Sequence, residues 1–131
     1  MERRDLLALM LLAALAPARA MANEEKKKGG GLSYIQIGAL TATILRPNGR
    51  RGVLTVETGI DVPNEKLRER AASLQPRLRA AYVQSLQIYG AGLPPATPPN
   101  LEYLGRELQR ETDRVLGKPG AKLLLGSVMA N

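Results

Sequence analysis

The fold is decided by residues 64–89, which read NEKLRERAASLQPRLRAAYVQSLQIY. Apolar and small residues recur in this stretch at steps of three and four, and charged residues fill the positions between them. That spacing draws one apolar stripe along a helix. The stripe comprises Leu67, Ala71, Leu74, Leu78, Ala81, Tyr82, Ser85 and Leu86. Runs typical of strands precede and follow the stretch, so we expect the stripe to pack on a sheet.

Proline and glycine set the limits of this helix. Asn64 is suited to cap its start. Pro76 lacks an amide hydrogen and crowds the carbonyl four residues earlier, so we predict two segments, near residues 65–75 and 76–88. The stretch from Gly90 to Pro99 holds four prolines and two glycines, which predicts a loop.

A second helix and a last strand are predicted after this loop. Asn100 can cap the helix, whose apolar stripe comprises Leu101, Leu104, Leu108, Val115 and Leu116. Gly117-Lys118-Pro119-Gly120 ends the helix and turns the chain. Residues 122–129, KLLLGSVM, then predict a third strand that is central in the sheet or covered on both faces.

A β-hairpin is predicted before the long helix. Strict alternation from Tyr34 to Arg46 puts apolar residues on both faces of the first strand, so each face should be partly covered. One face holds Ile35, Ile37, Ala39, Thr41, Thr43 and Leu45, and the other holds Gln36, Leu40, Ala42 and Ile44. Asn48 and Gly49 can supply the positive φ angles of a tight turn. The second strand, Gly52 to Val62, has Leu54, Val56, Ile60 and Val62 on one face.

The element order β-β-α-α-β predicts an α+β fold. We expect a three-stranded antiparallel-type sheet, packed on one side by the proline-kinked helix and the second helix. This domain spans residues 34–131.

Residues 1–22 read as an export signal. Arg3 and Arg4 precede an apolar run over residues 6–16, which is short for a membrane span of about 20 residues. Small-x-small sites allow cleavage after Ala20 or Ala22. The opening string Arg-Arg-Asp-Leu-Leu is similar to a twin-arginine export signal. We therefore expect export to the periplasm.

The alternative for the same segment is an uncleaved anchor, which would tether the protein at the outer face of the inner membrane. Residues 23–33 are rich in charge and glycine and predict a flexible linker between this segment and the domain.

Composition excludes most catalytic chemistry. The chain has no Cys and no His, which removes disulfides, thiol nucleophiles, imidazole bases and nearly all zinc or haem ligation. Glu57 and Asp61 share a strand face, but their Cα atoms should lie about 13 Å apart, too far for a usual catalytic pair. The serines have no histidine base. We expect no enzyme activity, no metal and no cofactor.

The formal net charge of +7 favours an anionic partner: lipid, nucleic acid or an acidic protein. Proteins that bind single-stranded nucleic acid interleave basic groups with aromatic rings, and this chain has four Tyr and no Phe or Trp. Together with the expected export, this composition argues against nucleic acid as the partner.

Several stretches in this order resemble the FliL family of flagellar basal-body-associated proteins. They are Tyr34-Ile-Gln-Ile-Gly, Gly52-Val-Leu-Thr-Val-Glu-Thr, Leu74-Gln-Pro-Arg-Leu-Arg-Ala-Ala-Tyr-Val, Leu104-Gly-Arg-Glu-Leu, Val115-Leu-Gly and Leu123-Leu-Leu-Gly-Ser-Val. The resemblance covers residues 34–129. It implies a periplasmic domain similar to the stomatin/prohibitin fold, association with the flagellar motor near its stator units, and assembly into rings. Family members usually carry a longer N-terminal transmembrane helix than the short run found here.

Two functions follow from these observations. The first is a non-enzymatic, FliL-like protein-interaction module at the flagellar basal body, which forms homo-oligomers through its helix face or a sheet edge. Its expected contact residues are Arg68, Arg70, Arg77 and Arg79, with the Pro94–Pro99 loop as a second patch. The alternative is an envelope or lipid-surface module unrelated to motility, in which Lys26–Lys28 and the helix arginines meet anionic headgroups.

Overall fold

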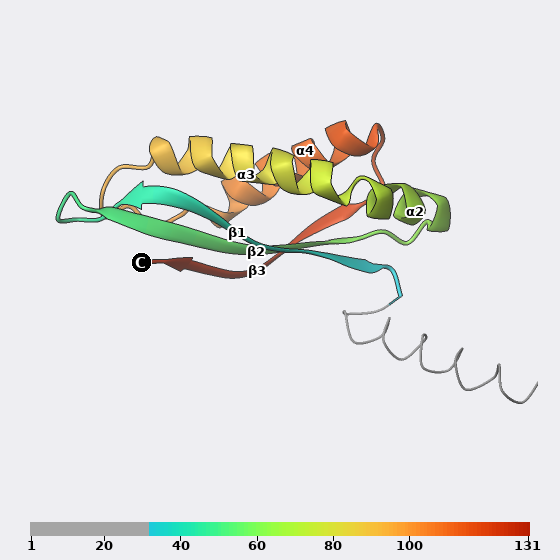
Figure 1. Cartoon of the computed structure of the whole chain (residues 1–131), viewed down its shortest axis with the longest axis horizontal. Coiled ribbons are helices and arrows are strands. Elements are labelled where there is room, and N and C mark those ends of the chain that lie inside the picture. Colours follow the sequence, from blue (N-terminus) through green and yellow to red (C-terminus); the bar gives the residue numbers. More distant parts are fainter. Residues whose placement is uncertain (1–31) are drawn as a thin grey trace, which may run out of the picture. The chain divides into compact units, whose positions relative to one another are not determined.

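Within residues 32–131, which the computed structural model describes, three antiparallel strands form one sheet and three helices cover one of its faces (Figure 1). The strands are β1, Tyr34–Leu45; β2, Arg51–Asp61; and β3, Lys122–Ala130. The helices are α2, Glu65–Ser73; α3, Gln75–Ala91; and α4, Leu101–Leu116. The predicted α+β fold and its element order are confirmed.

The predicted export signal, with its cleavage residues Ala20 and Ala22, lies outside the described residues, and so does the predicted linker up to Gly31. In the part of the chain that the structure does describe, no helix combines the length and the apolar character needed to cross a membrane.

The core lies between β2 and the helices. β2 is the central strand of the sheet, and its residues Leu54, Val56 and Ile60 are completely buried. Tyr82 and Leu86 of α3 are also completely buried and belong to the same apolar cluster. Burying one such aliphatic side chain stabilises the fold by roughly 1.5–3 kcal/mol. The predicted burial of one face of this strand is confirmed.

The break at Pro76 follows the prediction. α2 ends at Ser73, Leu74 adopts a non-helical conformation with ψ of 11°, and the proline sits in the first turn of α3. In that position its missing amide hydrogen breaks no helical hydrogen bond. At the start of α2, the side chain of Asn64 accepts a hydrogen bond of 2.9 Å from the amide of Leu67.

The loop after α3 begins later than predicted. Gly90 is buried in the last turn of the helix, and a Cβ atom at this position would lie 2.8 Å from the carbonyl oxygen of Thr43. The missing side chain lets α3 approach β1 closely and continue to Ala91. The prediction treated Gly90 as a helix breaker, whereas the glycine is required here for packing.

The hairpin turn is also less tight than predicted. Gly49 has a φ of +80°, but Asn48 is not among the positive-φ residues of the described chain. Asn48 instead uses its side-chain oxygen to accept a hydrogen bond of 3.0 Å from the amide of Arg50. The amide of Gly49 donates to the carbonyl of Arg46 at 2.9 Å, which closes the turn.

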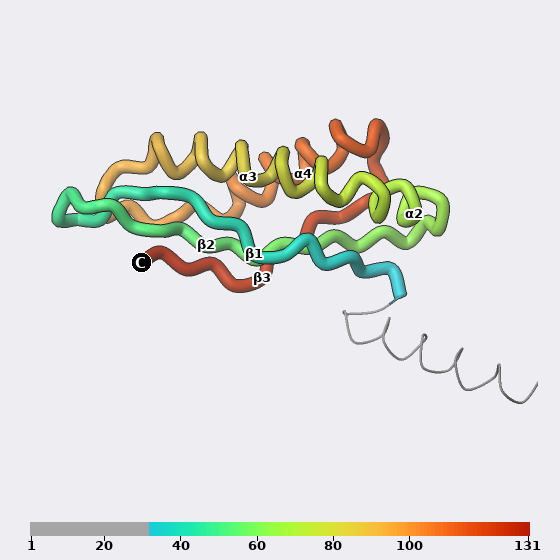
Figure 2. The backbone as a smooth tube through the Cα atoms, viewed as in Figure 1, coloured from blue at the N-terminus to red at the C-terminus, as the bar shows by residue number. Residues whose placement is uncertain are grey.

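The strict alternation predicted for β1 is wrong because a β-bulge interrupts it. The pairing with β2 shifts between Gln36 and Gly38, where Gly38 has a φ of +112°. Figure 2 shows the course of the β1 backbone alongside β2. The extra residue shifts the alternation by one position, so residues after the bulge take the opposite face from the one that strict alternation predicts. Ile37 therefore joins Leu40 on the buried face, while Thr41, like the next outward residues of the strand, is exposed.

β3 is an edge strand, which corrects the prediction that it is central or covered on both faces. Its pairing with β2 also contains a bulge, opposite Glu57. Leu123, Leu125 and Val128 are half-buried against the core, while Leu124 and Met129 are 38% and 52% exposed. A run of three leucines suggested a covered strand, but only alternate members of the run turn toward the helices.

α4 buries four of the five residues of the predicted stripe: Leu104, Leu108, Val115 and Leu116. Leu101 is 49% exposed, and Thr112 is completely buried between the apolar positions of this helix. The hydroxyl of Thr112 donates to the carbonyl of Leu108 at 2.7 Å and also bonds with the hydroxyl of Tyr82. Burial raises the pKa of Tyr82, while the hydrogen bond with Thr112 acts in the opposite direction.

Candidate functional site

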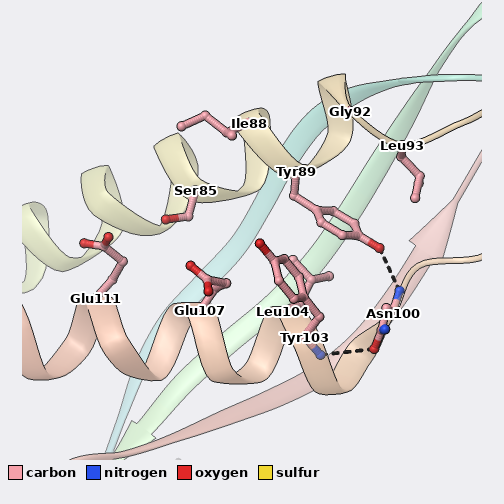
Figure 3. A pocket seen from close by; sticks show the side chains of 10 residues that line it. All are labelled: Ser85, Ile88, Tyr89, Gly92, Leu93, Asn100, Tyr103, Leu104, Glu107 and Glu111. Atoms are coloured by element: carbon pink, nitrogen blue, oxygen red, sulfur yellow. Dashed lines mark hydrogen bonds between the residues drawn. The ribbon is translucent and has the colours of Figure 1, made fainter.

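A groove runs between α3 and α4 and encloses about 530 Å³ (Figure 3). We call it the α3–α4 groove. It is lined by Ser85, Ile88, Tyr89, Gly92 and Leu93 on one side and by Asn100, Tyr103, Leu104, Glu107 and Glu111 on the other. The groove is therefore apolar and aromatic at the end near the 92–100 loop, and acidic at the opposite end.

Hydrogen bonds fix the aromatic end of the groove. The hydroxyl of Tyr89, from the end of α3, accepts a hydrogen bond of 2.7 Å from the amide of Asn100. The side chain of Asn100 in turn accepts a bond of 3.1 Å from the amide of Tyr103 and caps α4. Both bonds are visible in Figure 3. The end of one helix is thus tied to the start of the next.

The two tyrosine rings stack on one another across the groove. The ring centroids of Tyr89 and Tyr103 lie 5.7 Å apart, with an interplanar angle of 29°. Beside them Ile88 is 68% exposed and Tyr103 is 42% exposed, whereas Leu104 is buried beneath. The tyrosine pair is fixed by hydrogen bonds, lies next to the buried Leu104 and is partly open to solvent. It therefore offers a rigid apolar contact surface.

The acidic end is formed by Glu107 and Glu111, which lie one turn apart on α4. Their carboxylates point from α4 toward α3 in Figure 3. Each carboxylate also contacts an arginine three residues later: Arg110 at 3.3 Å, and Arg114. Both arginine side chains are largely exposed, so these pairs are weak and leave the carboxylates able to meet another cation.

The chemistry that this arrangement supports is binding. Ser85 is the nucleophile-type side chain of the groove, and the chain has no histidine to activate it. Nowhere in residues 32–131 do three or more Asp or Glu side chains gather closely enough to hold a metal ion. Of the two carboxylates first considered for catalysis, Glu57 is exposed on β2 and Asp61 accepts a hydrogen bond from the hydroxyl of Ser33.

Two of the four arginines predicted as contact residues bind the protein's own backbone. Arg68 donates to the carbonyl oxygens of Val62 and Pro63, at 3.0 and 3.3 Å, where the chain passes from β2 to α2. Arg79 donates to the carbonyls of Ile37 and Ala39, both at 3.0 Å, on either side of Gly38 in the β1 bulge. These contacts give both residues a structural role.

The other two arginines, Arg70 and Arg77, are exposed. Arg77 and Arg79 are two residues apart on α3, so their side chains project about 200° apart around the helix axis. The four arginines therefore form separate positions along α2 and α3 instead of one patch. Their role in binding a partner stays a prediction, and so does that of the largely exposed Pro94–Pro99 loop.

Sequence reasoning missed the α3–α4 groove. A signal was present: Tyr89 and Tyr103 are half of the tyrosines in the chain, and they flank the proline-rich loop. Ile88 also departs from the buried stripe of α3. An apolar stripe indicates only which side of a helix faces the sheet, and it carries no information about a surface that two helices share.

Comparisons of the chain with protein-family models, with curated proteins and with solved structures give no match.

Proposed function

We propose that this chain is a non-enzymatic protein-binding module, exported to the periplasm, that binds a component of the flagellar basal body. The single observation that supports binding is the α3–α4 groove, which combines a rigid, open aromatic pair with two carboxylates. The flagellar setting rests on the resemblance of residues 34–129 to the FliL family.

The groove suits a helical segment of a partner protein. Glu107 and Glu111 lie one helical turn from each other, and the tyrosine pair lies about one turn beyond Glu107. A partner helix laid along the groove would place a large apolar side chain between Ile88 and Tyr103 and a Lys or Arg over the carboxylates. Charge complementarity of this kind sets orientation and association rate more than affinity.

The test is capture of partners by the tagged, full-length protein from motile cells, with identification by mass spectrometry. Ile88→Glu adds a charge to the open side of the groove, so we expect it to lose motor or stator proteins that the parent captures. Leu101→Glu is the matched control, because Leu101 is similarly exposed but lines a different hollow on the far side of α4. Equal capture by all three proteins would contradict the proposal.

A second candidate is binding to an anionic lipid surface, which the excess of basic residues favours: 19 Lys and Arg against 12 Asp and Glu. Co-sedimentation with vesicles rich in anionic lipid separates the two candidates. Lipid binding would fall steeply with added salt and would be unaffected by Ile88→Glu. Vesicle binding of that kind, without capture of motor proteins, would favour the lipid-surface function.

A further inference from the structure

A hollow of about 640 Å³ lies between α2 and the turn that follows α4. We call it the α2–α4 hollow. Lys66 and Arg70 line it from α2 and Lys118 lines it from the turn, and all three side chains are exposed. Lys66 and Arg70 are one helical turn apart, so they project from the same side of α2. The hollow therefore gathers three cationic side chains from two separate elements.

Positive charge exceeds negative charge in this hollow. No ion pair within residues 32–131 includes any of the three cations. Among the described residues that line the hollow, Glu69 is the only acidic one. The C-terminus of α4 adds a partial negative charge, about half an elementary charge. Arg70 lies close to this C-terminus, because a Cβ atom at Gly117 would be 3.5 Å from its Nη2. The two negative contributions together offset about half of the positive charge.

The backbone is fixed on both sides of the hollow. The side chain of Asn64 caps the start of α2, and Gly117 ends α4 in the left-handed conformation, with a φ of +81°. Lys118 lies between this glycine and Pro119, and a residue that precedes proline has a restricted backbone. The base of the Lys118 side chain is therefore held in place across the hollow from α2.

The hollow also lies at the end of the domain where the chain enters it. The amide of Val62 donates to the carbonyl of Ser33 at 2.8 Å, and α2 begins three residues later at Glu65. Figure 1 shows α2 at the same end of the sheet as the start of β1. A membrane anchor in residues 1–22, the alternative to cleavage, would join the domain at this end.

We propose that the α2–α4 hollow is an anion-binding site that takes a terminal phosphate group. Such a group carries three acceptor oxygens and up to two negative charges, so Arg70 and lysines on both sides of the hollow can donate to it together. A carboxylate has two oxygens and one charge, and it would engage only part of this set. The phosphate belongs either to a lipid headgroup or to a soluble phosphate ester. This site is separate from the α3–α4 groove and does not depend on the binding proposed there.

The first test titrates inorganic phosphate into the full-length protein at constant ionic strength, with backbone amide shifts followed by NMR. We expect saturable shifts at Ser73, Gly117 and Lys118, which line the hollow. The same titration with acetate should give binding about tenfold weaker, because acetate offers fewer oxygens and less charge.

A pair of double variants then locates the site. Lys66→Gln/Arg70→Gln removes two cations from the hollow, so we expect phosphate binding about tenfold weaker. Arg50→Gln/Arg51→Gln is the matched control, because it removes two exposed arginines at the hairpin end of the sheet, opposite the end where α2 lies. It should bind phosphate like the parent. Glutamine has a helix propensity close to those of lysine and arginine, so α2 should keep its fold.

Lys118→Gln tests the other side of the hollow without altering α2, and it should also weaken phosphate binding. The proposal would be overturned by any of three results. The first is the absence of saturable shifts at the hollow. The second is equal weakening by the two double variants, which would indicate attraction to the net charge alone. The third is acetate binding as tight as phosphate binding, which would indicate a site for carboxylates.

The second test identifies the source of the phosphate. Co-sedimentation compares vesicles that contain phosphatidic acid, whose phosphate is terminal, with vesicles that contain the same fraction of phosphatidylglycerol, whose phosphate is a diester. Tighter binding to phosphatidic acid, by about fivefold, that Lys66→Gln/Arg70→Gln abolishes would assign the site to a lipid headgroup. Equal binding to the two vesicles, with the phosphate shifts intact, would assign it to a soluble phosphate ester.

These outcomes are separate from those for the groove. Ile88→Glu should leave the phosphate shifts intact, and Lys66→Gln/Arg70→Gln should leave capture through the groove intact. Failure of the phosphate titration with groove-dependent capture preserved would reject the anion site alone.

Discussion

Tyr82 and Thr112 place two hydroxyl groups in the middle of an aliphatic core. The cost of burying them is offset because the hydroxyls bond to each other and Thr112 also donates to the carbonyl of Leu108. No buried side-chain nitrogen or oxygen in residues 32–131 lacks a partner. The sequence pattern indicated the buried tyrosine, since it lies in the stripe of α3. It did not indicate Thr112, because a threonine is polar and would be expected at the surface of the helix. Its burial depends on hydrogen bonds to Tyr82 and Leu108, and the sequence pattern does not show them.

This pair should give the protein an alkaline instability. Burial raises the pKa of Tyr82 above its ordinary value of 10.0, so the folded state favours the neutral phenol. The resulting stabilisation is complete below pH 10 and is lost as the pH rises above it. Tyr82→Phe should therefore lower the free energy of unfolding by about 1 kcal/mol near neutral pH. Above pH 10 the difference in unfolding free energy between the parent and Tyr82→Phe should become smaller.

Urea unfolding of both proteins at several pH values measures this gap. Tyr103→Phe is the matched control for the loss of a tyrosine hydroxyl, because that ring is partly exposed. A gap between parent and Tyr82→Phe that stays constant through pH 11 would contradict the account.

At the scale of elements, α3 does more than cover the sheet. Arg79 and Gln75, one turn apart, extend from α3 to the carbonyls around the β1 bulge, and Thr58 of β2 donates to the carbonyl of Gly38 at 3.0 Å. A bulge exposes backbone groups that the ladder would otherwise use, and these side chains satisfy them. Pro76 predicted the helix break, and the residues of the turn predicted the hairpin. The bulge depends on long-range partners that no local pattern reveals.

Arg79 should therefore be more important for stability than its neighbour Arg77. Arg79→Ala removes two charge-assisted hydrogen bonds to Ile37 and Ala39, which should cost about 1–2 kcal/mol of unfolding free energy. Arg77→Ala removes an exposed side chain and should change stability by less than about 0.5 kcal/mol. Chemical denaturation of the two variants measures the difference, and similar losses for both would mean that the bulge does not depend on Arg79.

At the scale of the whole domain, the helix layer and the sheet present different surfaces. The helix layer carries the α3–α4 groove, and the opposite face of the sheet leaves Val53, Leu124 and Met129 partly exposed. Composition predicted a packed domain without catalytic chemistry, and periodicity predicted which side of each helix meets the sheet. Neither could predict the groove, because it arises where the sides of two helices, distant in sequence, come together. The expected arginine contacts came from exposure alone, which does not distinguish a free side chain from one that binds backbone.

The most direct test of the central claim is site-specific photo-crosslinking in motile cells. A photoreactive residue at position 88 lies on the open side of the α3–α4 groove, and the same residue at position 53 lies on the exposed face of the sheet as a control. We predict a crosslink from position 88, and not from position 53, to a protein of the flagellar motor, with the crosslinked site on a helix that carries an apolar residue next to a Lys or Arg. A crosslink from position 88 only to lipid, or equal products from both positions, would contradict the claim that this groove binds a motor protein.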